Sequence, residues 1–116
     1  MKEFVQVLDL HDDPAVFAQY ESHHRRVWPE VLDALREAGI ESMRLFRCGP
    51  RLVMIGAASD DFDPRGYAEY ARSSPRLIEW ETLMRTLQRP LPFAEAGSWW
   101  MPATEIFRWN ASDASP

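Results

Sequence analysis

The sequence predicts an α+β protein with the ferredoxin-like order β-α-β-β-α-β, in which one antiparallel sheet packs against two helical regions. Three observations predict this fold: apolar runs of strand length, apolar positions that repeat every three or four residues between them, and breaks that contain Gly or Pro. The order leaves one face of the sheet without helices. We therefore expect a second protomer to cover that face, which makes the protein a homodimer.

The first strand is predicted over residues 4–10, and a helical region follows it. Asp13 can accept a backbone N–H at the helix start, and Pro14 suits the first helical turn because its missing N–H is not needed there. Pro29 is expected to kink or restart the helix, and Gly39 to end it. One apolar stripe lies between these signals: Val16, Phe17, Tyr20, Val27, Val31, Leu35 and Ala38.

The second half begins with a predicted hairpin. Strands at residues 42–47 and 52–58 flank the Gly- and Pro-containing turn at residues 48–51. A second helical region is expected from Asp63–Pro64, interrupted at residues 73–75 by the same kind of break. Its apolar stripe consists of Leu77, Trp80, Leu83, Met84 and Leu87.

The C-terminal part is predicted to be less regular. Residues 89–102 contain several Pro and Gly residues and indicate a long loop, after which a last strand is expected over residues 104–109. We interpret residues 1–109 as one domain and residues 110–116 as a frayed tail.

Composition excludes several classes of protein. The chain has 116 residues, a formal net charge of −5 and 46% hydrophobic residues, which suits a globular core and offers no basic stripe for nucleic acid. The longest apolar run, residues 52–58, is too short to span a membrane. Cys48 is the single cysteine, and no signal peptide is visible at the start of the sequence, so we expect a protein of the reducing cytoplasm.

Tyr20, His24 and Trp28 are the most informative residues. They are spaced i, i+4 and i+8, so a helix places them on one side, within the apolar stripe. An imidazole there can take and return a proton near neutral pH, and a phenol one turn away can donate to a ligand. His23 is expected to point away into solvent.

Other interpretations of these residues stay open. A histidine on a half-buried helix face is often purely structural, and Trp80 with Met84 fits a core as well as a ligand wall. Metal binding has little support, because His23 and His24 are adjacent and point in different directions. The sequence has no Gly-rich phosphate loop and no nucleophile elbow, so we expect neither a metal nor a cofactor.

The same residues resemble the rhamnose mutarotase family. The resemblance covers nearly the whole chain up to Trp109 and keeps the order and spacing of its motifs. Those motifs are Tyr20-x-x-x-His24-x-x-x-Trp28-Pro29-Glu30, Leu35-x-x-x-Gly39-Ile40, Met43-x-Leu-Phe-Arg47, Arg51-Leu52-x-Met54-Ile55, Glu79-Trp80-Glu81-x-Leu83-Met84 and Ile106-Phe107.

The resemblance implies a dimeric α+β barrel that interconverts the α and β anomers of a 6-deoxy-L-sugar without a cofactor. It implies that His24 is the acid/base residue and that Tyr20 lies beside it in the sugar pocket. We expect Trp28 and Trp80 to form walls of that pocket.

Two departures from the rhamnose-specific members bear on the substrate. Those members carry a second pocket tyrosine where this chain has Met43, and tandem tryptophans where it has Trp80-Glu81. The substitutions, with the segment 88–92 and a Trp-x-Met-Pro loop, look more like the L-fucose mutarotase branch. We therefore expect L-fucose as substrate, with L-rhamnose second, and Met43, Trp80 and Glu81 as sugar-binding residues. A Glu81 carboxylate facing inward would accept a hydrogen bond from a sugar hydroxyl.

Two rival functions are compatible with the same fold. Dimeric α+β barrels also include cofactor-free monooxygenases and haem-binding proteins, in which His and Trp line a pocket for an aromatic ligand. A dimer that binds a small ligand without catalysis is the other. Sugar exchange activity and the absence of a haem absorbance band would separate the mutarotase from both.

Overall fold

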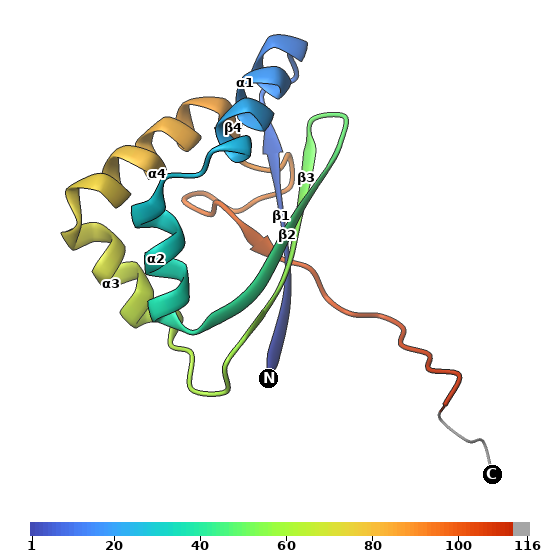
Figure 1. Ribbon diagram of the computed structural model, residues 1–116. Helices are drawn as coiled ribbons and strands as arrows, with labels where there is room; N and C mark the ends of the chain where they lie inside the picture. Colours follow the sequence, from blue (N-terminus) through green and yellow to red (C-terminus); the bar gives the residue numbers. More distant parts are fainter. Residues whose placement is uncertain (113–116) are drawn as a thin grey trace.

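The computed structural model describes residues 1–112 and shows one five-stranded sheet with four helices (Figure 1). The elements follow the predicted order, with each helical region divided in two. They are β1 (Lys2–Leu10), α1 (Pro14–Arg25), α2 (Pro29–Ala38), β2 (Ile40–Cys48), β3 (Arg51–Ala58), α3 (Pro64–Ser73), α4 (Pro75–Leu87), β4 (Gln88–Arg89) and β5 (Met101–Pro102).

The sheet has the strand order β2-β3-β1-β4, with β5 also paired to β1, and every pairing is antiparallel. The first strand therefore lies in the middle of the sheet, and the strand that follows the second helical region returns beside it. All four helices lie on one side of the sheet (Figure 1). This arrangement confirms the predicted ferredoxin-like α+β fold.

The helix boundaries follow the predicted local signals. The Asp13 carboxylate accepts a hydrogen bond from the Ala15 N–H at 2.9 Å. Pro29 restarts the helix rather than kinking it, because α1 ends at Arg25 and α2 begins at the proline. Gly39 ends α2 with a φ of 96°, a left-handed conformation that glycine adopts without steric cost.

The core lies between the helices and the sheet, and both predicted helical stripes contribute to it. Tyr20 and Val31 of the first stripe are buried, as are four of the five residues of the second. The buried cluster consists of Leu10, Tyr20, Val31, Ala34, Leu52, Leu77, Trp80, Met84 and Leu87. The side chains that later form the site are therefore fixed by the same packing that stabilises the fold.

The opposite face of the sheet is largely apolar and is covered by no helix of residues 1–112. Residues directly opposite in an antiparallel ladder share a face. Arg47, opposite Leu52, lies on the helix side, because its guanidinium packs 4.5 Å from the Phe17 ring of α1. Phe46, opposite Val53, must face the other way, and 47% of it is exposed. This open sheet face carries Val5, Val7, Phe46, Val53 and Ile55, together with Arg44, which lies opposite Ile55 with its guanidinium 5.2 Å from the centroid of the Phe46 ring.

The predicted strand at residues 104–109 is wrong. The last strand is β5, and after it the Ala103 N–H donates to the Val5 carbonyl oxygen at 2.8 Å before the chain leaves the body of the protein (Figure 1). A strand needs a neighbouring strand edge, and residues 104–109 pair with none in the part of this chain that the structure describes. Ile106, Phe107 and Trp109 are consequently 93%, 79% and 74% exposed.

The predicted loop at residues 89–102 is shorter in the structure, since β4 and β5 at its two ends pair with β1. Residues 110–112 of the predicted tail are exposed, and residues 113–116 lie outside the described residues. None of the helices within residues 1–112 has the length and apolar character needed to cross a bilayer.

Candidate active site

Four aromatic side chains predicted from the sequence come together between α1, α2 and α4. The Tyr20 and His24 rings of α1 have centroids 4.4 Å apart. Trp80 of α4 meets His24 edge-on at 5.6 Å, and Trp28, just before α2, meets Trp80 at 5.2 Å. The spacing of the helix, together with burial of Trp80, therefore assembles a cluster in which the His24 imidazole lies between Tyr20 and Trp80.

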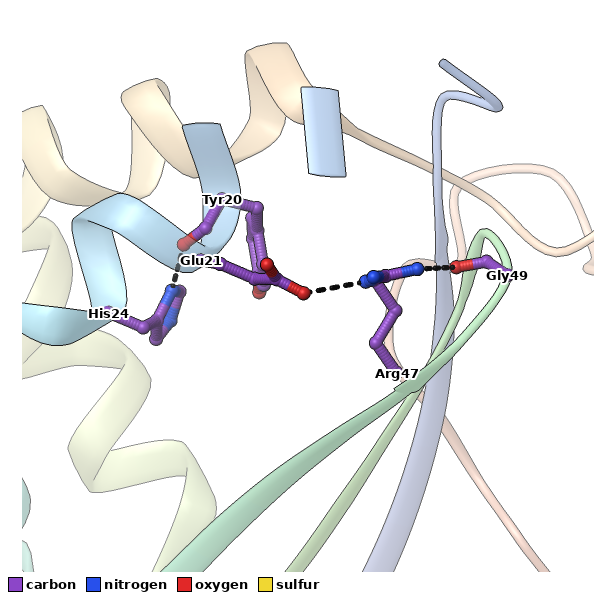
Figure 2. A network of polar contacts seen from close by, with 5 residues as sticks. All are labelled: Tyr20, Glu21, His24, Arg47 and Gly49. Atoms are coloured by element: carbon purple, nitrogen blue, oxygen red, sulfur yellow. Dashed lines mark hydrogen bonds and ion pairs between the residues drawn. The ribbon is translucent and has the colours of Figure 1, made fainter. Parts of the chain in front are cut away.

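The imidazole of His24 is held in one tautomer. Its Nδ1 lies 2.8 Å from the backbone carbonyl oxygen of Tyr20, as Figure 2 shows. A carbonyl oxygen can only accept, so Nδ1 carries the hydrogen and Nε2 of the neutral ring has a free lone pair. Burial lowers the pKa of His24 below its ordinary value of 6.5, which keeps the ring neutral at neutral pH.

The phenol of Tyr20 is buried and protonated. Its oxygen accepts a hydrogen bond from Gln88 Nε2 at 3.1 Å. Burial raises the pKa of Tyr20 to about 12, and the Gln88 bond opposes that rise. The group beside the His24 ring is therefore a neutral hydroxyl that can still donate its proton.

Polar contacts fix α1 against the β2–β3 hairpin. Arg47 Nε donates to Glu21 Oε1 at 2.9 Å, and Arg47 Nη1 donates to the Gly49 carbonyl oxygen at 3.1 Å (Figure 2). Both side chains are partly exposed, so the ion pair contributes little to stability. The ion pair instead holds α1 in position, since it joins Glu21, the residue next to Tyr20, to the hairpin turn through Arg47.

Trp28 and Trp80 already have protein partners in this structure. The Arg76 guanidinium lies 3.8 Å from the centroid of the Trp28 ring, and Trp80 is 8% exposed. An Arg over an indole is a favourable cation–π contact. The two indoles therefore form a fixed wall behind His24.

Met43 and Glu81 lie apart from this aromatic cluster. Met43 lines an open groove of about 640 Å³ beneath α2 with Leu32 and Leu35. Glu81 is largely exposed and forms an ion pair with Arg85 at 3.3 Å, although its charge is near enough to raise the pKa of Tyr20. The structure thus brings four of the six predicted site residues together and leaves these two outside.

The prediction that His23 points into solvent is wrong. Its side chain is half-buried, and its ring lies edge-on to Trp80 with centroids 6.5 Å apart. His23 is rotated by one residue around the helix from His24, but the Trp80 indole is large enough to contact both imidazole rings.

Sequence reasoning missed two residues of the site. Gln88 is buried beside Tyr20, and Trp99 Nε1 donates to Gln88 Oε1 at 2.7 Å. Gln88 stands in the sequence as a polar residue directly after an apolar helix stripe, at the start of the segment 88–92 that resembles the L-fucose branch, and neither signal predicted its contact with Tyr20. Of the other C-terminal tryptophans, Trp100 packs against the core and Trp109 is exposed.

The arrangement can move protons at neutral pH. An unprotonated imidazole nitrogen and a protonated phenol, held side by side, supply a base and an acid at once. Such a pair suits a neutral ligand that must lose a proton at one oxygen and gain one at another.

Comparisons with known proteins identify the family of the chain. The chain matches the L-rhamnose mutarotase family over residues 3–109. It is 45% identical to an L-fucose mutarotase of Xanthomonas campestris over 109 residues, which is 92% of this chain and 87% of that protein. It is 26% identical to an L-rhamnose mutarotase of Leptothrix cholodnii over 80 residues, or 69% of this chain and 74% of that protein.

Solved structures show the same fold. The crystal structure of L-rhamnose mutarotase from Formosa agariphila superposes with a TM-score of 0.67 at 15% identity, covering 95% of this chain and all of that one. Tetracenomycin F2 cyclase from Streptomyces glaucescens superposes with a TM-score of 0.59 at 25% identity over 96% of this chain and 99% of that one. The match to the family over almost the whole sequence confirms the predicted resemblance: the chain belongs to the L-rhamnose mutarotase family, whose named members are isomerases that act on carbohydrates.

Proposed function

We propose that the protein interconverts the α and β anomers of a 6-deoxy-L-hexose, with L-fucose preferred and L-rhamnose second. The observation that carries this proposal is the hydrogen bond from His24 Nδ1 to the Tyr20 carbonyl oxygen, which leaves Nε2 as a base beside a protonated phenol. The relative named L-fucose mutarotase, which matches 92% of the chain, supports the choice of sugar.

The reaction needs one proton removed and one supplied. His24 Nε2 takes the proton of the anomeric hydroxyl, the electrons of that O–H bond form the aldehyde C=O, and the C1–O5 bond breaks. The Tyr20 hydroxyl donates its proton to O5 as negative charge develops there. Rotation about C1–C2 presents the other face of the aldehyde, and the reverse transfers close the ring and restore both residues. No electrons leave the sugar, so the chemistry balances with these two groups alone.

We assign the recognition of the sugar to Trp28, Trp80, Glu81 and Met43. Trp80 would offer an apolar wall next to His24, with Trp28 behind it. Glu81, the next residue along α4, would accept a hydrogen bond from a sugar hydroxyl, for which it must exchange its exposed ion pair with Arg85. Met43 lies two residues before Leu45 on β2 and therefore on the same face of the sheet, the helix side, where Leu45 packs against the core. Met43 would contribute to sugar binding from that side.

We also propose that the working unit is a homodimer. The open sheet face presents contiguous valine, isoleucine and phenylalanine side chains, and an antiparallel sheet with an apolar second face requires a cover. The exposed Ile106, Phe107 and Trp109 add apolar surface on the segment that leaves the body. A second copy, related by two-fold symmetry, would bury both surfaces at once.

The test is a comparison of two sugars under identical conditions. Saturation-transfer NMR measures the rate of α/β exchange for L-fucose and for L-rhamnose with a catalytic amount of protein. We expect acceleration for both and a higher kcat/KM for L-fucose. A higher kcat/KM for L-rhamnose would reverse the assigned preference, and exchange at the uncatalysed rate for both sugars would refute the function.

A further inference from the structure

A chain of two hydrogen bonds runs from the C-terminal loop to the phenol of Tyr20. Trp99 Nε1 donates to Gln88 Oε1 at 2.7 Å, and Gln88 Nε2 donates to Tyr20 Oη at 3.1 Å. Gln88 is 4% exposed and sits at the start of β4, where it pairs with Leu10 of β1. The amide therefore occupies a fixed position between the loop and α1.

The direction of this chain follows from the chemistry of its first member. An indole N–H can only donate, so the amide oxygen of Gln88 must face Trp99. The amide NH₂ then faces Tyr20, whose oxygen accepts. A flipped amide would put its NH₂ against the indole N–H, with no acceptor between them, at the cost of an unsatisfied buried donor.

This direction determines what Tyr20 can do for a ligand. Because the phenol oxygen already accepts from Gln88, its own hydrogen is not used in the chain and remains available to a partner outside it. The Gln88 N–H also stabilises negative charge on that oxygen, as its lowering effect on the pKa of Tyr20 indicates. Both effects favour proton donation by Tyr20.

We infer that Gln88, oriented by Trp99, is a positioning residue that makes Tyr20 the hydrogen-bond donor to the ring oxygen of the sugar. The inference rests on the proposed function and extends it, because it assigns the acid step to an arrangement of three side chains. A leucine at this buried position, opposite Leu10 of β1, would fill the space without setting the direction of any hydrogen bond.

The sharpest test is Gln88→Glu, which keeps the size of the side chain and the acceptor for Trp99. An ionised carboxylate has no hydrogen to give, so the Tyr20 hydroxyl must donate to it and is lost to the sugar. We expect kcat for L-fucose exchange to fall by about 10- to 100-fold above neutral pH, up to the lower end of the ~10²- to 10⁴-fold that a lost acid/base group typically costs, with a smaller change in KM.

The kcat of this variant should change with pH in a direction that a purely structural role of Gln88 would not produce. When the buried carboxyl group of the variant is protonated, its O–H donates to Tyr20 and restores the original direction; burial raises the pKa of such a group. The kcat of Gln88→Glu should therefore rise as pH falls toward neutrality. The unmodified protein should show no such rise, since its His24 must stay unprotonated.

Two further variants decide between positioning and packing. In a Tyr20→Phe background, Gln88→Glu should cause no additional loss of kcat, because the group that it orients is gone. Gln88→Met should shift the Trp99 indole N–H signal in a ¹H–¹⁵N NMR spectrum, since the bond to the amide oxygen is removed.

Three results would overturn the inference. They are a Gln88→Glu variant with the unmodified kcat and pH profile, an equal loss of kcat with and without Tyr20, and a Trp99 signal that Gln88→Met leaves unchanged. Absence of exchange in the unmodified protein would instead refute the proposed function, and with it this inference, while circular dichroism separates all of these results from loss of the fold.

Discussion

His24 Nδ1 lies 2.8 Å from the backbone carbonyl oxygen of Tyr20, one helical turn earlier in α1. The contact joins two residues four positions apart, so the spacing of the helix alone is enough to produce it. It fixes which imidazole nitrogen is free, and the same turn places the Tyr20 ring 4.4 Å from the imidazole. One local hydrogen bond thus leaves an imidazole nitrogen with a free lone pair beside a protonated phenol, the two groups that we propose as base and acid.

The pH dependence of exchange should reflect a histidine that is active when neutral. Burial lowers the pKa of His24 below 6.5, so protonation that removes the base occurs only at a pH below that value. We expect kcat/KM for L-fucose to stay level through neutral pH and to fall only on the acid side, with a midpoint below 6.5. Exchange rates by NMR across pH check this, and a midpoint above the ordinary value would contradict it.

Truncation of a core side chain between α1 and β1 should lower the stability of the protein. Leu10 is fully buried in the cluster that contains Tyr20, so Leu10→Ala should lower the free energy of unfolding by about 2–5 kcal/mol. Leu32→Ala is the matched control, because that leucine is 46% exposed; it should change stability by no more than about 0.5 kcal/mol. Urea unfolding at one protein concentration measures both free energies, and similar losses would contradict the assignment of Leu10 to the core and of Leu32 to the surface.

Glu81 should influence which sugar is accepted. Glu81→Trp replaces a hydroxyl acceptor by an apolar wall and restores the tandem tryptophans of the rhamnose-specific pattern. We expect the ratio of kcat/KM for L-fucose to that for L-rhamnose to fall severalfold. Glu81 is largely exposed, so the fold should be unaffected. An unchanged ratio would remove Glu81 from sugar recognition.

The open sheet face should hold the dimer together. Phe46→Arg places a second positive charge beside Arg44, whose guanidinium lies 5.2 Å from the centroid of the Phe46 ring, and should shift the protein toward the monomer, because two unpaired like charges are costly to bury. Ile78→Arg is the control, since Ile78 is 45% exposed on α4 and Phe46 is 47% exposed. Sedimentation velocity distinguishes the two, and a monomeric unmodified protein, or equal effects of both variants, would contradict the proposed interface.

The features that sequence predicted well depend on neighbours within one or two helical turns. Asp13, Pro29 and Gly39 act through backbone groups next to them, and the structure places the helix ends where those residues stand. The association of Tyr20 with His24 likewise needs only a regular helix between them. Such local relationships can be predicted from sequence because they do not depend on the tertiary contacts of the rest of the chain.

The features that sequence missed depend on distant partners. An apolar run at residues 104–109 is strand-like, but it pairs with no other strand within residues 1–112. Gln88 meets Tyr20 across 68 positions, and Trp99 reaches back over a loop to meet Gln88. No local pattern encodes the orientation of that amide, because it follows from which groups tertiary packing brings within hydrogen-bond distance.

The proposed role of His24 is tested most directly by removing its imidazole and, separately, that of the adjacent His23. His24→Ala should reduce the L-fucose exchange rate by about 10²- to 10⁴-fold, as expected for a lost acid/base group, with an unchanged circular dichroism spectrum. His23→Ala, a neighbouring half-buried histidine without the bond to Tyr20, should retain the rate to within a few-fold. Exchange in His24→Ala at the rate of the unmodified protein would contradict the central claim that His24 is the base.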